Sequence, residues 1–338
     1  MPRGQRIVLA RRPVGAPVDG DFRLEDFDFG APADGEILLQ TLFLSLDPYM
    51  RGRMSDAPSY AAKVEIDQTI VGGTVSRVLE SKNSGFAKGD LALSYSGWRT
   101  HEVSNGAGLM KLDPAMKRPS LALGMLGMPG HTAYYGLLEI GDPKPGETVC
   151  VAAATGPVGA TVAQIAKIKG CRVIAIAGGA DKAAYARDVL KADVALDHKA
   201  PDFAEQLKQA TPNGIDVYFE NVGGDVFKAV FPRLNNFARV PVCGLIAWYN
   251  LTDAPPGPDR VPGMMRQILT KRLRIQGFII SDGNKRFRDF QSDMSKWISE
   301  GKVAIREDVV DGLANAPRAF MGLLEGRNFG KLIVKMAD

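Results

Sequence analysis

Short apolar runs separated by turn residues dominate the chain up to about residue 120. The runs 36–46, 69–80 and 90–103 are rich in β-branched and aromatic residues, and glycine-containing turns at 72–73 and 88–90 separate them. Segments with helical spacing are scarce in this part of the chain. The pattern therefore predicts a β-rich, barrel-like first domain.

From about residue 125 the pattern changes to an alternation of strand-like and helix-like segments. The predicted strands are 147–154, 171–177, 193–198, 215–224, 238–245 and 273–280. The predicted helices are 131–141, 157–169, 181–190, 201–210, 225–234 and 285–301. Such alternation over short loops indicates a parallel sheet with helices on both faces, which right-handed crossovers make doubly wound. A Pro/Gly-rich loop is predicted at 255–263, and the final stretch returns to strand-like runs such as 331–336.

Composition changes this picture little. The chain has 338 residues, too many for most single cores, so two domains are expected. The formal net charge of +4 is spread over scattered basic residues; it suits an anionic small ligand as well as nucleic acid and decides nothing by itself. With no basic block and no long apolar run, we expect neither nucleic acid nor a membrane as a partner.

The three cysteines, Cys150, Cys171 and Cys243, are widely spaced and lie in strand-like apolar runs. An odd number without a CxxC pair argues against a disulfide framework and for a reducing compartment. The N-terminus shows no basic and apolar pattern typical of a signal peptide. We therefore expect a cytoplasmic protein.

The segment AAATGPVGA, 152–160, stands at the first strand-to-helix turn of the alternating part. Ala154, Gly156 and Gly159 occupy the small positions of the GxGxxG fingerprint, with Ala in the first position. These residues are expected to allow the tight turn, the approach of a pyrophosphate and the close packing of the helix, in that order. Thr155, Pro157 and Val158 complete a helix N-terminus, which favours an anion. A tight junction that binds nothing is the alternative, but the ordered strands and helices favour dinucleotide binding.

The end of the second predicted strand indicates which dinucleotide is bound. An NAD site usually has an acidic residue there, whereas this chain has Gly178 and Gly179, followed by Lys182. Asp181 is expected to be the N-cap of the next helix, with its carboxylate occupied by backbone N–H groups. Lys182 could pair with a 2′-phosphate, or it could simply be a solvated lysine. The pattern favours NADP(H).

The residues that most metal and hydrolytic chemistry requires are scarce. The three histidines, at positions 101, 131 and 198, and the three cysteines do not form a zinc pattern, and GxSxG, HExxH and P-loop motifs are missing from the sequence. Hydride transfer without a metal needs an electron-poor carbon, such as the β-carbon of an α,β-unsaturated ketone or aldehyde. The enolate oxygen that forms then needs hydrogen-bond donors.

Six segments spread along nearly the whole chain together resemble one family. They are 44–54, 127–141, 152–160, 220–224, 242–250 and 327–335. The family is that of the zinc-free medium-chain dehydrogenase/reductases, in the branch of prostaglandin reductase, plant alkenal double-bond reductases and bacterial curcumin reductase. The resemblance implies a GroES-like catalytic domain over 1–124 and 304–338, a Rossmann NADP(H)-binding domain over 125–303, and a homodimer. It also implies NADPH-dependent reduction of an activated carbon–carbon double bond.

The resemblance also implies roles for particular residues of the cofactor site. Lys182 matches a lysine that meets the 2′-phosphate, and Asn221 and Phe278 match residues near the nicotinamide. Cys243 and Gly244 match backbone that lines the nicotinamide ribose. Asn328 matches an asparagine that reaches the cofactor from the other domain.

Two tyrosines match the substrate site of the family. Tyr249 resembles a tyrosine that donates a hydrogen bond to the substrate carbonyl or enolate, and the alternative is a loop tyrosine that packs on the cofactor. Tyr49 resembles a tyrosine of the substrate cleft, and the alternative is a core residue.

The chain departs from the family at two positions. His198 replaces a tyrosine near the adenosine phosphate; when protonated it would bind the phosphate and make cofactor binding pH-sensitive. Lys191 replaces a helix-ending glycine; either the lysine is left-handed, at a cost of roughly 1 kcal/mol, or the helix ends differently.

Two other functions stay open on the sequence. A zinc-free quinone oxidoreductase would have the same fold and would take an apolar quinone in place of an enone or enal. A non-catalytic NADPH-binding protein, such as a redox-sensing or crystallin-like member of the family, would bind the cofactor without turnover.

Overall fold

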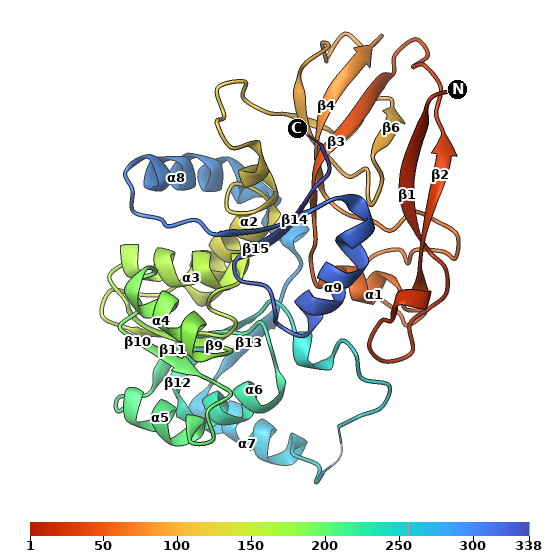
Figure 1. Ribbon diagram of the computed structural model, residues 1–338. Coiled ribbons are helices and arrows are strands. Elements are labelled where there is room, and N and C mark those ends of the chain that lie inside the picture. Colours follow the sequence, from red (N-terminus) through yellow and green to blue (C-terminus); the bar gives the residue numbers. More distant parts are fainter. Residues whose placement is uncertain (256, 338) are drawn as a thin grey trace. The chain divides into compact units, whose positions relative to one another are not determined.

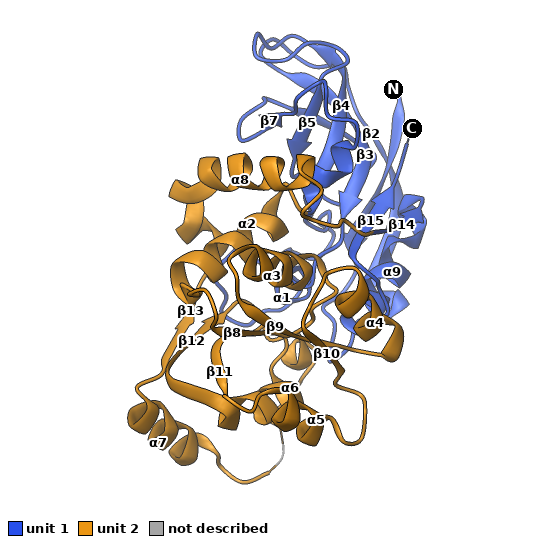
Figure 2. Cartoon of the chain, turned by 90° about the vertical axis from the view of Figure 1, so that its left-hand side faces the viewer, with its two compact units in different colours: residues 1–124, 307–338 blue, residues 125–306 orange. Residues whose placement is uncertain are grey.

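The structure is a computed structural model that describes residues 1–255 and 257–337. The chain divides into unit 1, residues 1–124 with 307–338, and unit 2, residues 125–306 (Figure 2). Pro256, in the predicted loop 255–263, and Asp338, in the predicted catalytic domain, lie outside the described residues. Within the described ranges, each helix is too short or too polar to cross a bilayer.

The described part of unit 1 contains a seven-stranded sheet with the order β14-β15-β3-β4-β5-β7, in which β6 pairs with β3. Its strands are β3 (Ile37–Ser45), β4 (Thr74–Ser81), β5 (Leu91–Ser94), β6 (His101–Ser104), β7 (Met110–Lys111), β14 (Glu307–Asp311) and β15 (Lys331–Lys335). Neighbouring strands are antiparallel except β14 and β15, which are parallel. A separate antiparallel pair consists of β1 (Arg3–Leu9) and β2 (Phe22–Asp28).

Two predictions for unit 1 need correction. The segment 90–103, predicted as one strand, forms β5 and β6, because the chain turns between them at Gly97, which has a φ of 76°. The last part of the chain, predicted from its strand-like runs, also contains the helix α9 (Ala316–Leu324). This helix and the short α1 (Tyr49–Arg53) pack through Met50, Ala316 and Phe320 into a core that Trp98 shares. The predicted β-rich character of this part of the chain is confirmed.

The described part of unit 2 contains a six-stranded parallel sheet with the order β10-β9-β8-β11-β12-β13. Figure 1 labels β9 to β13 of this sheet, and Figure 2 labels β8 as well. Its strands are β8 (Thr148–Val151), β9 (Arg172–Ala177), β10 (Val194–Asp197), β11 (Ile215–Phe219), β12 (Leu234–Val242) and β13 (Arg274–Gly277). Its helices are α2 (Met128–Tyr135), α3 (Pro157–Ile168), α4 (Ala180–Asp188), α5 (Phe203–Ala210), α6 (Gly224–Val230), α7 (Val261–Lys271) and α8 (Phe287–Ser299), with a π-helical turn at Gly136–Gly141. The predicted doubly wound sheet is confirmed, whereas α7, which begins inside the predicted loop 255–263, was not predicted.

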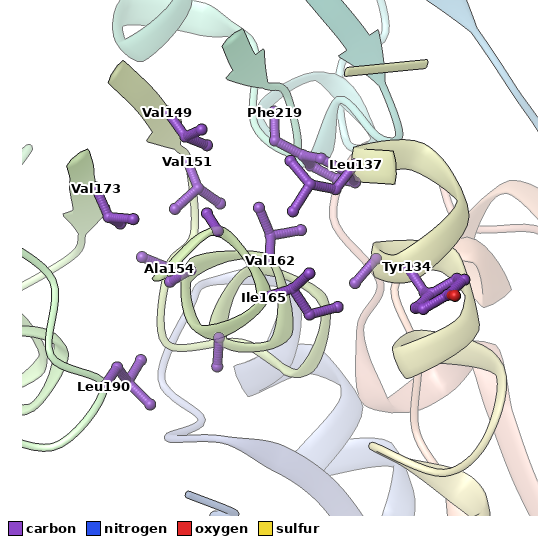
Figure 3. Packing of buried hydrophobic residues seen from close by; sticks show 14 of the residues in the cluster. Tyr134, Leu137, Val149, Val151, Ala154, Val162, Ile165, Val173, Leu190 and Phe219 are labelled. Carbon is purple, nitrogen blue, oxygen red and sulfur yellow. The ribbon is translucent and has the colours of Figure 1, made fainter. Parts of the chain in front are cut away.

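Successive residues of the central strands face opposite sides of this sheet, and each side is covered by its own helices. Val149 and Val151 of β8 pack with Val162 and Ile165 of α3, as Figure 3 shows. Cys150, between the two valines, belongs instead to the core shared with α5 and α6. A strand buried on both faces explains why its sequence is continuously apolar rather than alternating.

The sheet order reverses at the two central strands. From β8 the chain continues to β9 and β10 on one side, and then returns to β11 on the other side. In open parallel sheets, ligands bind at such a switch point, beyond the carboxyl ends of the strands. The loops at the carboxyl ends of the strands of this sheet are therefore the place to look for the candidate site.

Candidate active site

The turn between β8 and α3 contains the predicted fingerprint, and one role within it needs correction. The residue in the left-handed conformation is Ala153, with a φ of 51°, and not Ala154. Ala154 is fully buried, and its N–H donates to the carbonyl oxygen of Ile176 in β9 at 2.9 Å. The small side chain of Ala154 therefore fits the turn into the core, while Ala153 makes the reversal.

Gly159 and Gly156 differ in the space around them. A Cβ atom at Gly159 would lie 2.3 Å from the carbonyl oxygen of Ala153, so only glycine lets α3 pack so close to the strand end. At Gly156, the N-cap of α3, a Cβ atom would meet a single described atom within 4 Å, the same oxygen at 3.4 Å. The chain therefore leaves room beside Gly156, which suits the close approach of a phosphate group.

The start of α3 supplies donors to this room. Pro157 is the first helical residue and lacks an N–H group, and Thr155 before it is buried. Val158 follows Pro157 within the first turn of the helix, where N–H groups have no intrahelical acceptor and the helix dipole favours an anion. These residues fit the pyrophosphate of a dinucleotide.

Gly178 after β9 and His198 after β10 lie close together, and the charge of Lys182 acts on His198. A Cβ atom at Gly178 would lie 2.9 Å from Nε2 of His198, so the missing side chain leaves room for the imidazole. Burial is the largest cause that lowers the pKa of His198; the Asp197 carboxylate opposes this shift, and the charges on Lys199 and Lys182 add to it. The lowered pKa favours the neutral imidazole in the absence of a ligand, and the binding of a phosphate by the protonated form stays a prediction.

Asp181 does not have the predicted role. The N-cap of α4 is Gly179, with a φ of 109° and no side-chain hydrogen bond at the cap, and Asp181 lies exposed in the first helical turn. The backbone conformation explains the shift, because this left-handed position suits glycine. The carboxylate of Asp181 is therefore not occupied as a cap.

A carboxylate that sequence reasoning missed organises this corner. Oδ1 of Asp197, the last residue of β10, accepts hydrogen bonds from the N–H groups of Gly179 at 2.8 Å and Lys199 at 2.9 Å. Burial opposes its ionisation, but these two hydrogen bonds, together with the charges of His198 and Lys199, outweigh burial and lower the pKa of Asp197. The sequence offered one sign of this role: Asp197 lies near the end of a predicted strand, and the pair Gly178 and Gly179 directly follows the preceding predicted strand.

The structure shows the first of the two alternatives for Lys191, at the end of α4. This residue is left-handed, with a φ of 61°, and its Nζ donates to the carbonyl oxygen of Asp188 at 2.6 Å. A hydrogen bond to one of the last helical carbonyl groups offsets part of the conformational cost.

A cavity of about 430 Å³ lies within unit 2 at the carboxyl ends of β12 and β13. Its lining residues are Val242, Cys243, Gly244, Leu245, Tyr249, Gly277, Phe278, Ile279 and Asp282. Sequence reasoning named Cys243, Gly244, Tyr249 and Phe278, and their chain neighbours complete the wall. Residues from two distant segments thus line one cavity, as a binding site requires.

The side chains of this cavity differ in what they can do. The N–H of Leu245 donates to the hydroxyl oxygen of Tyr249 at 3.4 Å, which fixes the phenol over Gly244. Burial, aided by the negative charge of Glu220, raises the pKa of Cys243 to about 12, so its thiol is neutral. Cys243 therefore contributes backbone and volume rather than a thiolate nucleophile.

Asn221 connects the cavity side of unit 2 to the fingerprint turn. This residue follows β11, and its side-chain Nδ2 donates to the carbonyl oxygen of Ala152 at 2.8 Å. The loop after β11 is therefore tied to the turn after β8, across the switch point of the sheet.

Two predicted residues belong to unit 1. Tyr49 begins α1, and burial, followed by the charge of Asp47, raises the pKa of its phenol well above the usual value, so it stays protonated. Asn328 precedes β15, and its Nδ2 donates to the carbonyl oxygen of Gly330 at 2.9 Å. Both residues belong to unit 1, whereas the site residues described above belong to unit 2.

Comparisons with known proteins show which family the chain resembles. Residues 5–112 match the family "N-terminal domain of oxidoreductase", and residues 157–300 match the family "Zinc-binding dehydrogenase". The chain is 58% identical over 336 residues to NADPH-dependent curcumin reductase of Escherichia coli, covering 99% of this chain and 97% of that one. It is 44% identical over 333 residues to prostaglandin reductase 1 of Mus musculus, covering 97% of each.

The chain belongs to the zinc-free medium-chain dehydrogenase/reductases. A crystal structure of CurA from Vibrio vulnificus in complex with NADPH superimposes with a TM-score of 0.96, at 55% identity and 99% coverage of both chains. The predicted fold, a GroES-like part and a Rossmann part, is confirmed by this similarity. Although one family description mentions zinc, residues 1–255 and 257–337 contain no group of three or more His, Cys, Asp or Glu side chains placed to hold a metal ion.

Proposed function

We propose that the chain is an NADPH-dependent reductase of the carbon–carbon double bond in α,β-unsaturated ketones and aldehydes. The observation that carries the proposal is the 58% identity, over nearly the full length, with an NADPH-dependent curcumin reductase. The NADPH complex of CurA, at 55% identity, supports the cofactor. The physiological substrate is an apolar small molecule of this class.

The residues of unit 2 fit NADP(H). We assign the pyrophosphate to the turn 154–159, where the space beside Gly156 and the first N–H groups of α3 can receive it. We assign the 2′-phosphate to the corner of Gly178, Lys182 and His198, where an ammonium group can pair with it. When bound, the nicotinamide supplies the hydride for the β-carbon of the substrate.

The nicotinamide end is assigned to the cavity at the ends of β12 and β13. There Cys243 and Gly244 offer backbone, Phe278 offers an apolar surface, and Asn221 holds the adjoining loop. Phe278, which is 8% exposed, gives this end of the cavity a buried apolar wall. We assign Asn328 of unit 1 to the same cofactor by its resemblance to the family.

Tyr249 is proposed as the donor that stabilises the enolate oxygen. Its hydroxyl oxygen accepts the N–H of Leu245, a contact that aims the phenol and strengthens its O–H as a donor. A donor aimed at the oxygen where charge develops lowers the barrier to hydride addition. The protonated phenol of Tyr49 is proposed as a contact of the substrate in unit 1.

Turnover of a substrate panel tests this proposal. The purified chain is mixed with NADPH or NADH and with a simple enone, an enal, a quinone or no acceptor, and the absorbance of the reduced cofactor is followed. Consumption of NADPH with the enone and the enal, with a saturated carbonyl product, supports the proposal. Consumption with the quinone alone favours quinone oxidoreduction, and binding of NADPH without any turnover favours a non-catalytic protein.

We also propose a homodimer in the cytoplasm. In the described sheet of unit 2, β13 is an edge strand that pairs only with β12, and its side chains at Arg274 and Gln276 are exposed. Such an edge offers backbone groups to a second copy. Light scattering that gives the mass of one chain at working concentration would refute the dimer. All three cysteines are free thiols, in keeping with a reducing compartment, and cell fractionation tests the location.

A further inference from the structure

Glu220 is a buried carboxylate to which neither the sequence patterns nor the resemblance gives a role. It follows β11 directly and is 1% exposed. Its Oε1 accepts the N–H of Val222 at 2.6 Å and the N–H of Gly223 at 2.9 Å, and its Oε2 accepts the hydroxyl of Tyr218 at 3.0 Å. The carboxylate therefore closes the loop 221–223 back onto the end of the strand.

The main chain of Glu220 holds the wall of the cavity. Its carbonyl oxygen accepts the N–H of Cys243 at 2.9 Å and of Gly244 at 3.2 Å, and both of these residues line the cavity. Its own N–H donates to the carbonyl oxygen of Pro241 at 3.0 Å. The end of β12 and the start of its loop are thus fixed by one residue of the neighbouring strand.

The loop that the carboxylate closes reaches Tyr249. The carbonyl oxygen of Asn221 accepts the N–H of Ile246 at 3.4 Å, and that of Val222 accepts the N–H of Ala247 at 2.9 Å. These two acceptors hold the turn Ile246–Trp248, directly before Tyr249. A change in the loop 221–223 is therefore passed to the phenol and to the cavity wall through named hydrogen bonds.

We propose that Glu220 is the positioning residue of the nicotinamide end of the site: its carboxylate sets the loop 221–223, which in turn sets the cavity wall and Tyr249. This inference rests on the proposed function, because it assigns the cavity to the nicotinamide. Glu220 is not among the residues that line the cavity, and it acts through the residues that it holds.

Physical chemistry favours a positioning role over a role in stability alone. Burial raises the pKa of Glu220 even though the N–H groups of Val222 and Gly223 and the Tyr218 hydroxyl favour its ionised form. A buried carboxylate is a poor way to gain stability, since a neutral side chain of similar size avoids the desolvation. Its advantage is short, directional acceptance of two adjacent N–H groups, which fixes a loop closely. Gly223 is left-handed, with a φ of 76°, as this turn requires.

Three variants test the inference. Glu220→Gln keeps the shape and removes the charge, and Tyr218→Phe removes only the third hydrogen bond. The matched control is Asp216→Asn at the amino end of the same strand, where Oδ2 accepts the N–H of Thr148 at 2.8 Å, away from the cavity. For each variant we measure the Tm, the KM for NADPH and for the enone, kcat, and the affinity for a 2′-phosphorylated adenosine nucleotide that lacks nicotinamide.

We expect Glu220→Gln to fold, to raise the KM for NADPH about fivefold to tenfold and to lower kcat by a similar factor, since charged acceptors bond about twice as strongly as neutral ones. Its affinity for the nucleotide without nicotinamide should stay that of the unaltered chain, because the adenosine corner is untouched. Tyr218→Phe should change the same quantities in the same direction but less. Asp216→Asn should lower the Tm and leave the kinetic constants unchanged.

The possible failures are distinct. If the unaltered chain does not bind NADPH, the proposed function falls, and this inference falls with it. If the unaltered chain binds NADPH and reduces the enone while Glu220→Gln keeps its kcat and its KM for NADPH, only the inference is overturned. Equal weakening of NADPH and of the nucleotide without nicotinamide would likewise overturn it, since the effect would then not be confined to the nicotinamide end.

Discussion

Gly156 and Gly159 lie on the same turn, but a methyl group added at each position meets different surroundings. At Gly159 the new Cβ atom would lie 2.3 Å from the carbonyl oxygen of Ala153 and 2.8 Å from its carbonyl carbon. At Gly156 it would lie 3.4 Å from that oxygen, and the φ of −75° suits alanine. Alanine at each position in turn therefore separates packing within the chain from contact with the cofactor.

The expected effects on stability follow from these contacts. Gly159→Ala should lower the free energy of unfolding by about 1–3 kcal/mol, the usual cost of overpacking. Alanine gains about 1 kcal/mol over glycine inside a helix, so a net loss means that the clash exceeds this gain. The Tm should fall by roughly 2–10 °C. Gly156→Ala should change the free energy of unfolding by less than about 0.5 kcal/mol.

For the binding of NADPH, the larger effect is expected from Gly156→Ala. The methyl group of Gly156→Ala occupies the space that we assign to the pyrophosphate, so the Kd for NADPH should rise about tenfold or more, equivalent to about 1.4 kcal/mol. Thermal unfolding without ligand and a fluorescence titration with NADPH measure the two quantities for each variant. Wild-type affinity in Gly156→Ala would remove the pyrophosphate from this turn, and an unchanged Tm in Gly159→Ala would show that the backbone of Ala153 yields freely.

Four further predictions concern single side chains. Lys182→Ala should lower the preference for NADPH over NADH, measured as a ratio of kcat/KM, about tenfold or more, because an ammonium group no longer pairs with the 2′-phosphate; an unchanged ratio contradicts the assignment. Tyr249→Phe should lower kcat about 10- to 100-fold while the Kd for NADPH stays constant, since only the donor to the enolate is lost; equal kcat would exclude that role. Burial lowers the pKa of His131, which is 3% exposed. Its contribution to stability is therefore present above a pH of about 6.5 and is lost as the pH falls through the lowered pKa. Chemical unfolding between neutral and acidic pH should show a shallower decline of the free energy of unfolding for His131→Phe than for the unaltered chain. Lys331→Met should lower the free energy of unfolding by about 3–5 kcal/mol, because removal of one partner of a buried ion pair leaves a buried charge. The side chains of Lys331 and Asp47 are 3% and 7% exposed and form an ion pair at 2.6 Å. A loss of unfolding free energy below about 1 kcal/mol would mean that water reaches the pair.

The sequence determined the fold of unit 2 because its information is local and periodic. Alternating apolar segments of strand and helix length predict a doubly wound sheet, and a run of small residues at the first strand-to-helix turn predicts the place for a dinucleotide. The left-handed Lys191 was one of two alternatives that resemblance to the family suggested, and the structure decides between them. The cavity residues Tyr249 and Phe278 were reached through resemblance and not through periodicity.

Tertiary structure decided what the buried acceptors do. The sequence shows Asp197 and Glu220 as acidic residues at strand ends, but which N–H groups they accept depends on how the following loops fold back onto them. The same holds for Ala153, which takes the left-handed conformation because α3 packs against its carbonyl group through Gly159. Periodicity describes which face of an element is buried. The hydrogen-bond partners of a loop are set by contacts between segments distant in sequence, and only the folded chain brings those segments together.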